Sequence, residues 1–139
     1  MYLLDTNVVS ELRKAKAGKA DKNVKAWADS VSATSLYLSA IAILELETGV
    51  LLIERRDPLQ GRILRGWLED HVLPAFSERI LAVDTAVARR CAKLHVPDRR
   101  SDRDALIAAT ALVHRMAIVT RNVADFEPTG VKLINPWGG

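Results

Sequence analysis

Several features that mark other protein classes are missing from this 139-residue sequence. The only cysteine, Cys91, excludes an intramolecular disulfide and a cysteine-rich zinc site, and a chain without disulfides is expected in the cytoplasm. No run of about 18 apolar residues is present, so no transmembrane helix and no membrane contact are expected. Asp5 interrupts the short apolar start and no basic region precedes it, which argues against a signal peptide.

The usual catalytic signatures are absent as well. The sequence contains no nucleophile elbow, no Walker loop and no glycine fingerprint for dinucleotide binding. Its three histidines, His71, His95 and His114, have no metal-binding spacing, and each is interpreted as a surface or helix-end residue. Any site must therefore be sought among other side chains.

The charge of the chain gives little indication of a partner. Lysine and arginine number 20 and aspartate and glutamate number 17, which gives a net charge of +3 and a pI near 9.2. An ordinary solvated surface explains this excess as well as nucleic-acid binding does. If three or four of the acids share one pocket with a metal, the remaining surface is more basic than the total indicates.

Apolar runs and helical patterns alternate along the chain. Five runs are interpreted as strands, at residues 2–4, 36–38, 80–83, 117–120 and 131–134. Stretches of helical periodicity lie between them, one of which is expected to stop at Pro74, whereas Arg13–Lys25 is interpreted as an exposed basic loop leading into a helix. No repeat or linker is present, so residues 1–139 are expected to form one domain. The alternation predicts an α/β fold with a mainly parallel sheet covered on both faces.

Acidic residues stand beside apolar runs at three places. Asp5 ends the first predicted strand, where a parallel sheet holds its ligands, although it also suits an N-cap. Glu45 lies beside the apolar face of a helix and, being costly to bury alone, needs a cation, a pocket or a local salt bridge. Asp104 opens an alanine-rich helix, and Asp102 just before it is interpreted as the cap.

A polar loop follows the fourth predicted strand. Asn122 and Asp125 lie in it, and taken alone they are ordinary turn residues. In a parallel sheet this loop would lie beside the end of the first strand and therefore near Asp5. Asp84 has a similar position after the third strand but is interpreted as a plain N-cap. Because converging carboxylates repel each other and persist mainly where a cation offsets the repulsion, the pattern predicts a metal site.

Five short segments carry the most specific signal in the sequence. They are LLDTNVVSE at residues 3–11, LSAIAILEL at 38–46 with GV at 49–50, DALIAATA at 104–111, VTRNVADF at 119–126 and NPW at 135–137. In this order, and over essentially the whole chain, they resemble the motifs of the PIN-domain family, in its VapC/FitB branch. The resemblance implies a three-layer α/β/α sandwich and the toxin of a type II toxin–antitoxin module, a metal-dependent endoribonuclease inhibited by its antitoxin.

The resemblance also implies which acids form the site. Asp5, Glu45 and Asp104 match acidic positions of the family and are the expected catalytic residues and ligands of Mg²⁺ or Mn²⁺. Asn122 occupies the fourth acidic position as an uncharged residue. Asp125, one helical turn further on, is expected to share its role. The number of metal ions stays open.

Three more residues are expected to bind substrate. Thr6 and Thr120 match small hydroxyl positions of the family, and Arg121 lies beside the predicted site, although a plain surface role is the simpler interpretation of any single arginine. The implied reaction is hydrolysis of an RNA phosphodiester bond, in transfer or ribosomal RNA, leaving a 5′ phosphate and a 3′ hydroxyl. The metal would activate water and neutralise a phosphate oxygen.

Partners follow from the same resemblance. A homodimer is expected, with a VapB-like antitoxin that enters the active-site groove and operator DNA that is bound only through the antitoxin. The alternative is a FitB-like component of a DNA-binding repressor complex with little or no nuclease activity. The amide at Asn122 leaves a third interpretation open, a PIN scaffold without catalysis.

Overall fold

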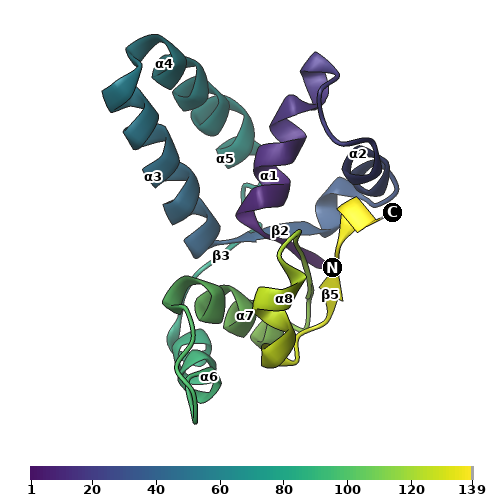
Figure 1. Cartoon of the computed structure of the whole chain (residues 1–139), viewed down its shortest axis with the longest axis vertical. Coiled ribbons are helices and arrows are strands. Elements are labelled where there is room, and N and C mark those ends of the chain that lie inside the picture. Colours follow the sequence, from purple (N-terminus) through teal and green to yellow (C-terminus); the bar gives the residue numbers. More distant parts are fainter. Residues whose placement is uncertain (139) are drawn as a thin grey trace.

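The computed structural model describes residues 1–138 and contains a five-stranded sheet in which every neighbouring pair of strands is parallel (Figure 1). The strands are β1 Tyr2–Leu4, β2 Leu36–Ser39, β3 Ile80–Leu81, β4 Ala117–Val119 and β5 Leu133–Ile134. Their order is β3-β2-β1-β4-β5, so the first strand of the chain is the central one. The strand order changes direction between β1 and β4, which is where ligands bind in open parallel sheets.

Helical segments connect the strands. Between β1 and β2 lie α1 Thr6–Leu12, η1 Arg13–Ala17, α2 Lys22–Asp29 and η2 Ala33–Ser35. Between β2 and β3 lie α3 Ala40–Arg56, α4 Pro58–Trp67, the π-helical turn η3 Leu68–Val72 and α5 Leu73–Ala75. Between β3 and β4 lie α6 Thr85–Leu94 and α7 Asp102–His114, and β4 is followed by α8 Val123–Phe126 and η4 Glu127–Thr129. The short helix η5 Pro136–Gly138 follows β5.

The two faces of the sheet are covered by different helices. Successive side chains of a strand point to opposite faces, so Leu3 packs in one core with α6 and α7, and Leu4 packs in the other with α1 to α4. Ile118 and Val119 of β4 divide in the same way. Figure 1 shows α6, α7 and α8 on one side of the sheet and α1 to α5 on the other. The predicted three-layer α/β/α sandwich is therefore confirmed.

Alanines let α7 lie close to the sheet. Ala105, Ala108, Ala109 and Ala111 are all fully buried, and their small side chains leave little distance between the helix axis and the strands. This close packing brings the first turn of α7, which contains Asp104, to the edge of the sheet.

The helices α3 and α4 form a hairpin that extends away from the sheet (Figure 1). Asp57 ends α3 and caps α4 by accepting a hydrogen bond from the Gln60 N–H, and Pro58 occupies the first helical position, where no N–H is needed. Gly61 permits the close approach, because a Cβ atom there would lie 2.4 Å from the Cα of Glu54.

Some predicted boundaries are wrong. Pro74 lies within α5, and the helical run formed by α4, η3 and α5 ends at Ala75, one residue after the predicted stop. Arg13–Lys25 is not simply a loop, since Arg13–Ala17 forms a 3₁₀ helix and α2 begins at Lys22. The third, fourth and fifth strands are shorter than predicted. Within residues 1–138, no helix combines the length and apolar character that crossing a membrane requires.

Candidate active site

Asp5 follows β1 at the carboxyl edge of the sheet and is only 7% exposed. Its Oδ1 accepts a hydrogen bond from the backbone N–H of Thr6 at 2.8 Å, so it caps α1. Its Oδ2 accepts hydrogen bonds from the Thr120 hydroxyl at 2.8 Å and from the Asn7 amide at 3.4 Å. The cap and the position at the sheet edge therefore belong to the same conformation of Asp5.

The pKa of the Asp5 carboxyl is raised above its ordinary value. Burial is the largest cause, and the hydrogen bonds from Thr120 and Thr6 oppose it. The negative charges of Glu45 and Asp125 raise the pKa further. Glu45 and Asp125 therefore lie within electrostatic reach of Asp5, although 40 and 120 positions along the chain separate them from it (45 − 5 and 125 − 5).

Thr120 and Asn7 join the ends of β1 and β4. The fully buried Thr120 hydroxyl donates to Asp5 and accepts a hydrogen bond from the Asn122 N–H at 2.9 Å. The Asn7 amide donates to that hydroxyl at 3.4 Å, and its Oδ1 accepts a hydrogen bond from the Arg121 N–H at 3.4 Å. Asn7 was not predicted as a site residue, because it has the sequence context of a helix cap. The available signal was its place two residues after Asp5.

Glu45 reaches the same region from the second turn of α3. Its Oε1 accepts a hydrogen bond from the Thr6 hydroxyl at 2.9 Å, which links α3 to the start of α1. Its Oε2 lies 3.8 Å from the Arg103 guanidinium, and both side chains are partly exposed, so this salt bridge is weak. Glu47 turns away and pairs with Arg65 at 2.6 Å. Glu45 is therefore the acid that α3 contributes to the site.

Asp104 approaches from the first turn of α7. Burial raises the pKa of its carboxyl most, followed by the charges of Asp125, Asp5 and Glu45. The four carboxylates thus form one group, each supplied by a different part of the chain.

Asp102 does not cap α7, which corrects the prediction. It is the first helical residue, and Ser101 occupies the cap position without a side-chain hydrogen bond. The Asp102 carboxylate instead pairs with Arg99 at 3.4 Å and with His95 at 3.6 Å. The helix dipole favours an acid anywhere in the first turn, which is why the sequence pattern does not separate these positions. Asp84 does cap α6, as predicted.

Asn122 and Asp125 lie at the exposed side of the group. Asn122 occupies the cap position of α8 but makes no side-chain cap bond. Asp125 raises the pKa of both Asp5 and Asp104. The fourth charge beside the other three acids therefore comes from Asp125.

The donor set fits a hard cation by its chemistry. The four carboxylates of this group offer oxygen atoms, which Mg²⁺ and Mn²⁺ prefer as ligands. Over residues 1–138, however, no three Asp, Glu, His or Cys side chains stand close enough to ligate one ion as they lie. The two observations differ because charges act over several ångströms whereas ligation needs contact. Ligation of one ion by three of these side chains would therefore require them to move from the positions that they have here.

Arg121 is held by the C-terminal segment. Its guanidinium lies 5.4 Å from the centre of the Trp137 ring, and the Trp137 carbonyl accepts a hydrogen bond from the Asn23 amide at 3.3 Å. The NPW segment therefore positions an exposed cation next to Asn122.

Comparison with known proteins gives matches over nearly the whole chain. The PIN domain family model matches residues 2–129. VapC ribonuclease Y4jK of Sinorhizobium fredii is 40% identical over 99% of this chain and 98% of its own length, and toxin FitB of Neisseria gonorrhoeae is 38% identical over 99% of each. A chain in the structure of FitAB bound to an IR36 DNA fragment superposes with a TM-score of 0.88 at 35% identity, covering 99% of this chain and 96% of that one.

Proposed function

This chain belongs to the PIN-domain family, and from that membership and its named relatives we propose that it is the toxin of a type II toxin–antitoxin module and an endoribonuclease dependent on Mg²⁺ or Mn²⁺. The observation that carries the proposal is the group of four carboxylates at the β1–β4 edge, Asp5, Glu45, Asp104 and Asp125, whose charges raise the pKa values of Asp5 and Asp104. Such a group is costly unless a cation offsets its repulsion.

Each acid has a proposed part in hydrolysis. Asp5, Glu45 and Asp104 would hold the ion. A divalent ion bound there supplies charge to neutralise a phosphate oxygen and to acidify water. Asp125, which is exposed at the mouth of the site, would accept the proton of the attacking water as general base.

The neutral residues would orient the acids and the RNA. Thr120 donates a hydrogen bond to one oxygen of Asp5, and Thr6 donates one to one oxygen of Glu45, so these hydroxyls would orient the two carboxylates. Asn122 offers an uncharged amide in place of a fourth acid. Arg121, whose guanidinium lies over the Trp137 ring, would contact a phosphate next to the cleaved one.

Cleavage of transfer RNA in the presence of Mn²⁺ tests this proposal. Replacing groups that merely support metal ligands costs about 10–100-fold, so Asp5→Asn is expected to reduce cleavage by about 100-fold or more. Asp29→Asn, an exposed acid on α2 that pairs with Lys25, is the matched control and should cleave like the parent protein. Equal cleavage by parent and Asp5→Asn would point to a contaminating nuclease and remove the enzymatic claim.

Partners are proposed from the relatives. We propose that a VapB-like antitoxin silences the chain, that operator DNA is contacted only through this antitoxin, and that the chain forms a homodimer in the cytoplasm. The DNA-bound FitAB structure, at 35% identity, supports the antitoxin and the operator DNA in this proposal. Light scattering of the free chain and of its complex with the product of a small adjacent gene would test the stoichiometry.

A second candidate function is a repressor subunit with little or no nuclease activity. It is favoured by the same DNA-bound relative and by the amide at Asn122. Asn122→Asp distinguishes the two functions. If the parent protein is a nuclease, it cleaves RNA, and this change adds a carboxylate to a site that already works. If the parent is a silent scaffold, it does not cleave RNA, and the variant is either also inactive or gains cleavage that the parent lacks.

A further inference from the structure

A groove extends from the carboxylates between α1–η1 and the α3–α4 hairpin. Close to the acids, a hollow is lined by Thr6 and Glu45 and reaches Trp67. A second hollow, of about 510 Å³, continues outward and is lined by Lys16, Arg62 and Trp67. Arg13 also lines both hollows, so they are adjoining parts of one groove. We call it the α1–α4 groove and define it by these residues.

Arg13 lies where the two hollows of the α1–α4 groove meet, and the Trp67 ring orients its guanidinium. Its guanidinium lies 5.9 Å from the centre of the Trp67 ring, a cation–π contact. The residue is exposed, and within residues 1–138 no carboxylate forms an ion pair with it. A guanidinium that stacks on a ring keeps its in-plane N–H groups available, and these match the oxygens of a phosphate.

Apart from Glu45 at the inner end, three acids on or next to the hairpin do not neutralise the groove, because they pair with Arg65. Three carboxylates pair with Arg65, those of Glu47 at 2.6 Å, Glu54 at 3.0 Å and Glu69 at 3.4 Å. Arg65 does not line either hollow. Arg13, Lys16 and Arg62 are left as three cations of the groove, with Asp70 as the one acid in the outer hollow. The outer part of the groove is therefore net positive.

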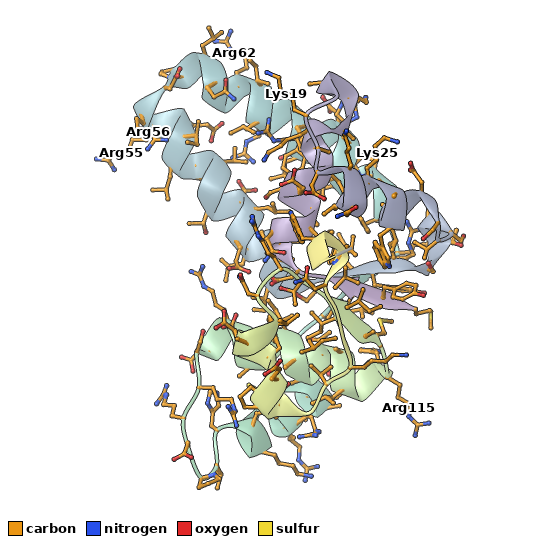
Figure 2. The ribbon with its side chains drawn as sticks, turned by 45° about the vertical axis from the view of Figure 1, so that its right-hand side comes forward. Lys19, Lys25, Arg55, Arg56, Arg62 and Arg115 are labelled. Carbon is orange, nitrogen blue, oxygen red and sulfur yellow. The ribbon has the colours of Figure 1, made fainter. Side chains whose placement is uncertain are left out.

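More positive charge lies at the same end of the molecule as the outer hollow. Figure 2 shows Arg62 on α4 and Lys19, just beyond η1, at the same end of the molecule, with Arg55 and Arg56 at the tip of the hairpin. The cations of the groove, Arg13, Lys16 and Arg62, thus face a wider positive region beyond it, whereas its inner end carries Glu45.

We propose that the α1–α4 groove binds the single strand of RNA that leads away from the cleavage site, with Arg13 on one phosphate and Lys16 and Arg62 on the next. The inference rests on the proposed function, since it extends the same site. A cationic groove that also contains an aromatic side chain is the usual means of binding single-stranded nucleic acid. Arg13 is a substrate-positioning residue, because it contacts the strand beside the reacting phosphate.

The test measures binding separately from cleavage. An Asp5→Asn background prevents hydrolysis, and the probe is a fluorescein-labelled oligouridylate titrated at several salt concentrations. Arg13→Ala should weaken binding by about 3–10-fold and reduce the slope of log K against log salt by about 0.7, the value for one lost phosphate contact on a single strand. Arg13→Lys keeps the charge and should retain the salt slope while losing part of the affinity.

The matched control removes a cation from a remote place. Arg115 lies at the opposite end of the molecule from Arg62 (Figure 2) and has a positive φ of 57°, a conformation that asparagine tolerates. Arg115→Asn should therefore leave affinity and slope unchanged. Equal affinity and equal slope for Arg13→Ala and its Asp5→Asn background would overturn the inference. It would also be overturned if Arg13→Ala weakened binding to the antitoxin but left binding to the oligouridylate unchanged. Cleavage by the parent protein is a separate measurement, so failure of the proposed function would be recognised independently.

Discussion

At the scale of single residues, the buried hydroxyl of Thr120 determines the position of the Asp5 carboxylate. It donates to Asp5 at 2.8 Å and accepts the Asn122 N–H at 2.9 Å, and the side chain is fully buried. One hydroxyl therefore satisfies a buried acid and a backbone donor at once. Its loss would leave both groups without that partner.

Thr120→Val should lower the free energy of unfolding by about 1–3 kcal/mol, because the shape is retained while buried polar groups lose a partner. Thr110→Val is the matched control. Thr110 is equally buried, but its hydroxyl bonds only the Leu106 carbonyl at 2.7 Å within the same helix, so its loss should cost less than about 1 kcal/mol. Urea denaturation measures both values. Equal decreases in the free energy of unfolding at the two positions would mean that the hydrogen bonds of Thr120 contribute no more to stability than that of Thr110.

The sequence and its family resemblance pointed to the acids of the site and to the two threonines that bind them, whereas they did not point to Asn7. Asp5, Glu45 and Asp104 stand out because a charge beside an apolar run is costly unless it has a use. Asn7 does not stand out, because its contact with Thr120 spans 113 positions and exists only where β1 and β4 are neighbours. The pairing of distant strands is a property of the folded sheet, and no local pattern encodes it.

At the scale of elements, the α3–α4 hairpin forms one wall of the groove that leads to the site. Its two helices meet at Gly61, where the backbone of α3 leaves no room for a side chain. Gly49, in the middle of α3, has open space around the position of a Cβ atom. A side chain would therefore clash at Gly61 but would fit at Gly49 of the same hairpin.

Gly61→Ala should destabilise the protein by about 1–3 kcal/mol, because the added methyl would lie 2.4 Å from the Glu54 Cα and must push the helices apart. Gly49→Ala should stabilise it by about 0.5–1 kcal/mol, because alanine favours the helix and nothing obstructs it. Chemical denaturation of both variants checks the contrast. If both substitutions change stability in the same direction, the close contact at Gly61 does not control the packing of the hairpin.

The sequence predicted the kind of each main element better than its ends. Strands and helices were identified from periodicity, and the cap residue Asp84 marked a helix start. The π-helical turn at Leu68–Val72 was missed, because its hydrogen bonds skip one more residue without any change in composition. The prediction that the helix stops at Pro74 was off by one residue, since the helical run ends at Ala75.

At the scale of the whole molecule, the sheet order brings the four carboxylates together. Asp5 lies at the end of the central strand, Glu45 at the start of α3, and Asp104 and Asp125 on helices that flank β4. Unfolding separates these charges, so their repulsion is a property of the folded state alone. Any substitution that removes one charge without removing its shape therefore acts on folding.

Asp104→Asn should raise the melting temperature by roughly 2–4 °C at neutral pH in protein stripped of divalent cations. The folded-state pKa of Asp104 is raised above its ordinary 3.8, first by burial and then by Asp125, Asp5 and Glu45. The charged form therefore opposes folding, and stability falls as pH rises from the unfolded value through the folded one. The gain should be complete at neutral pH and should vanish below about 3.8, where the parent carboxyl is also neutral. Asp102→Asn, which removes an exposed acid paired with Arg99, should give no gain. Calorimetric scans across pH decide the matter, and a gain that persists in acid would rule out charge repulsion as its cause.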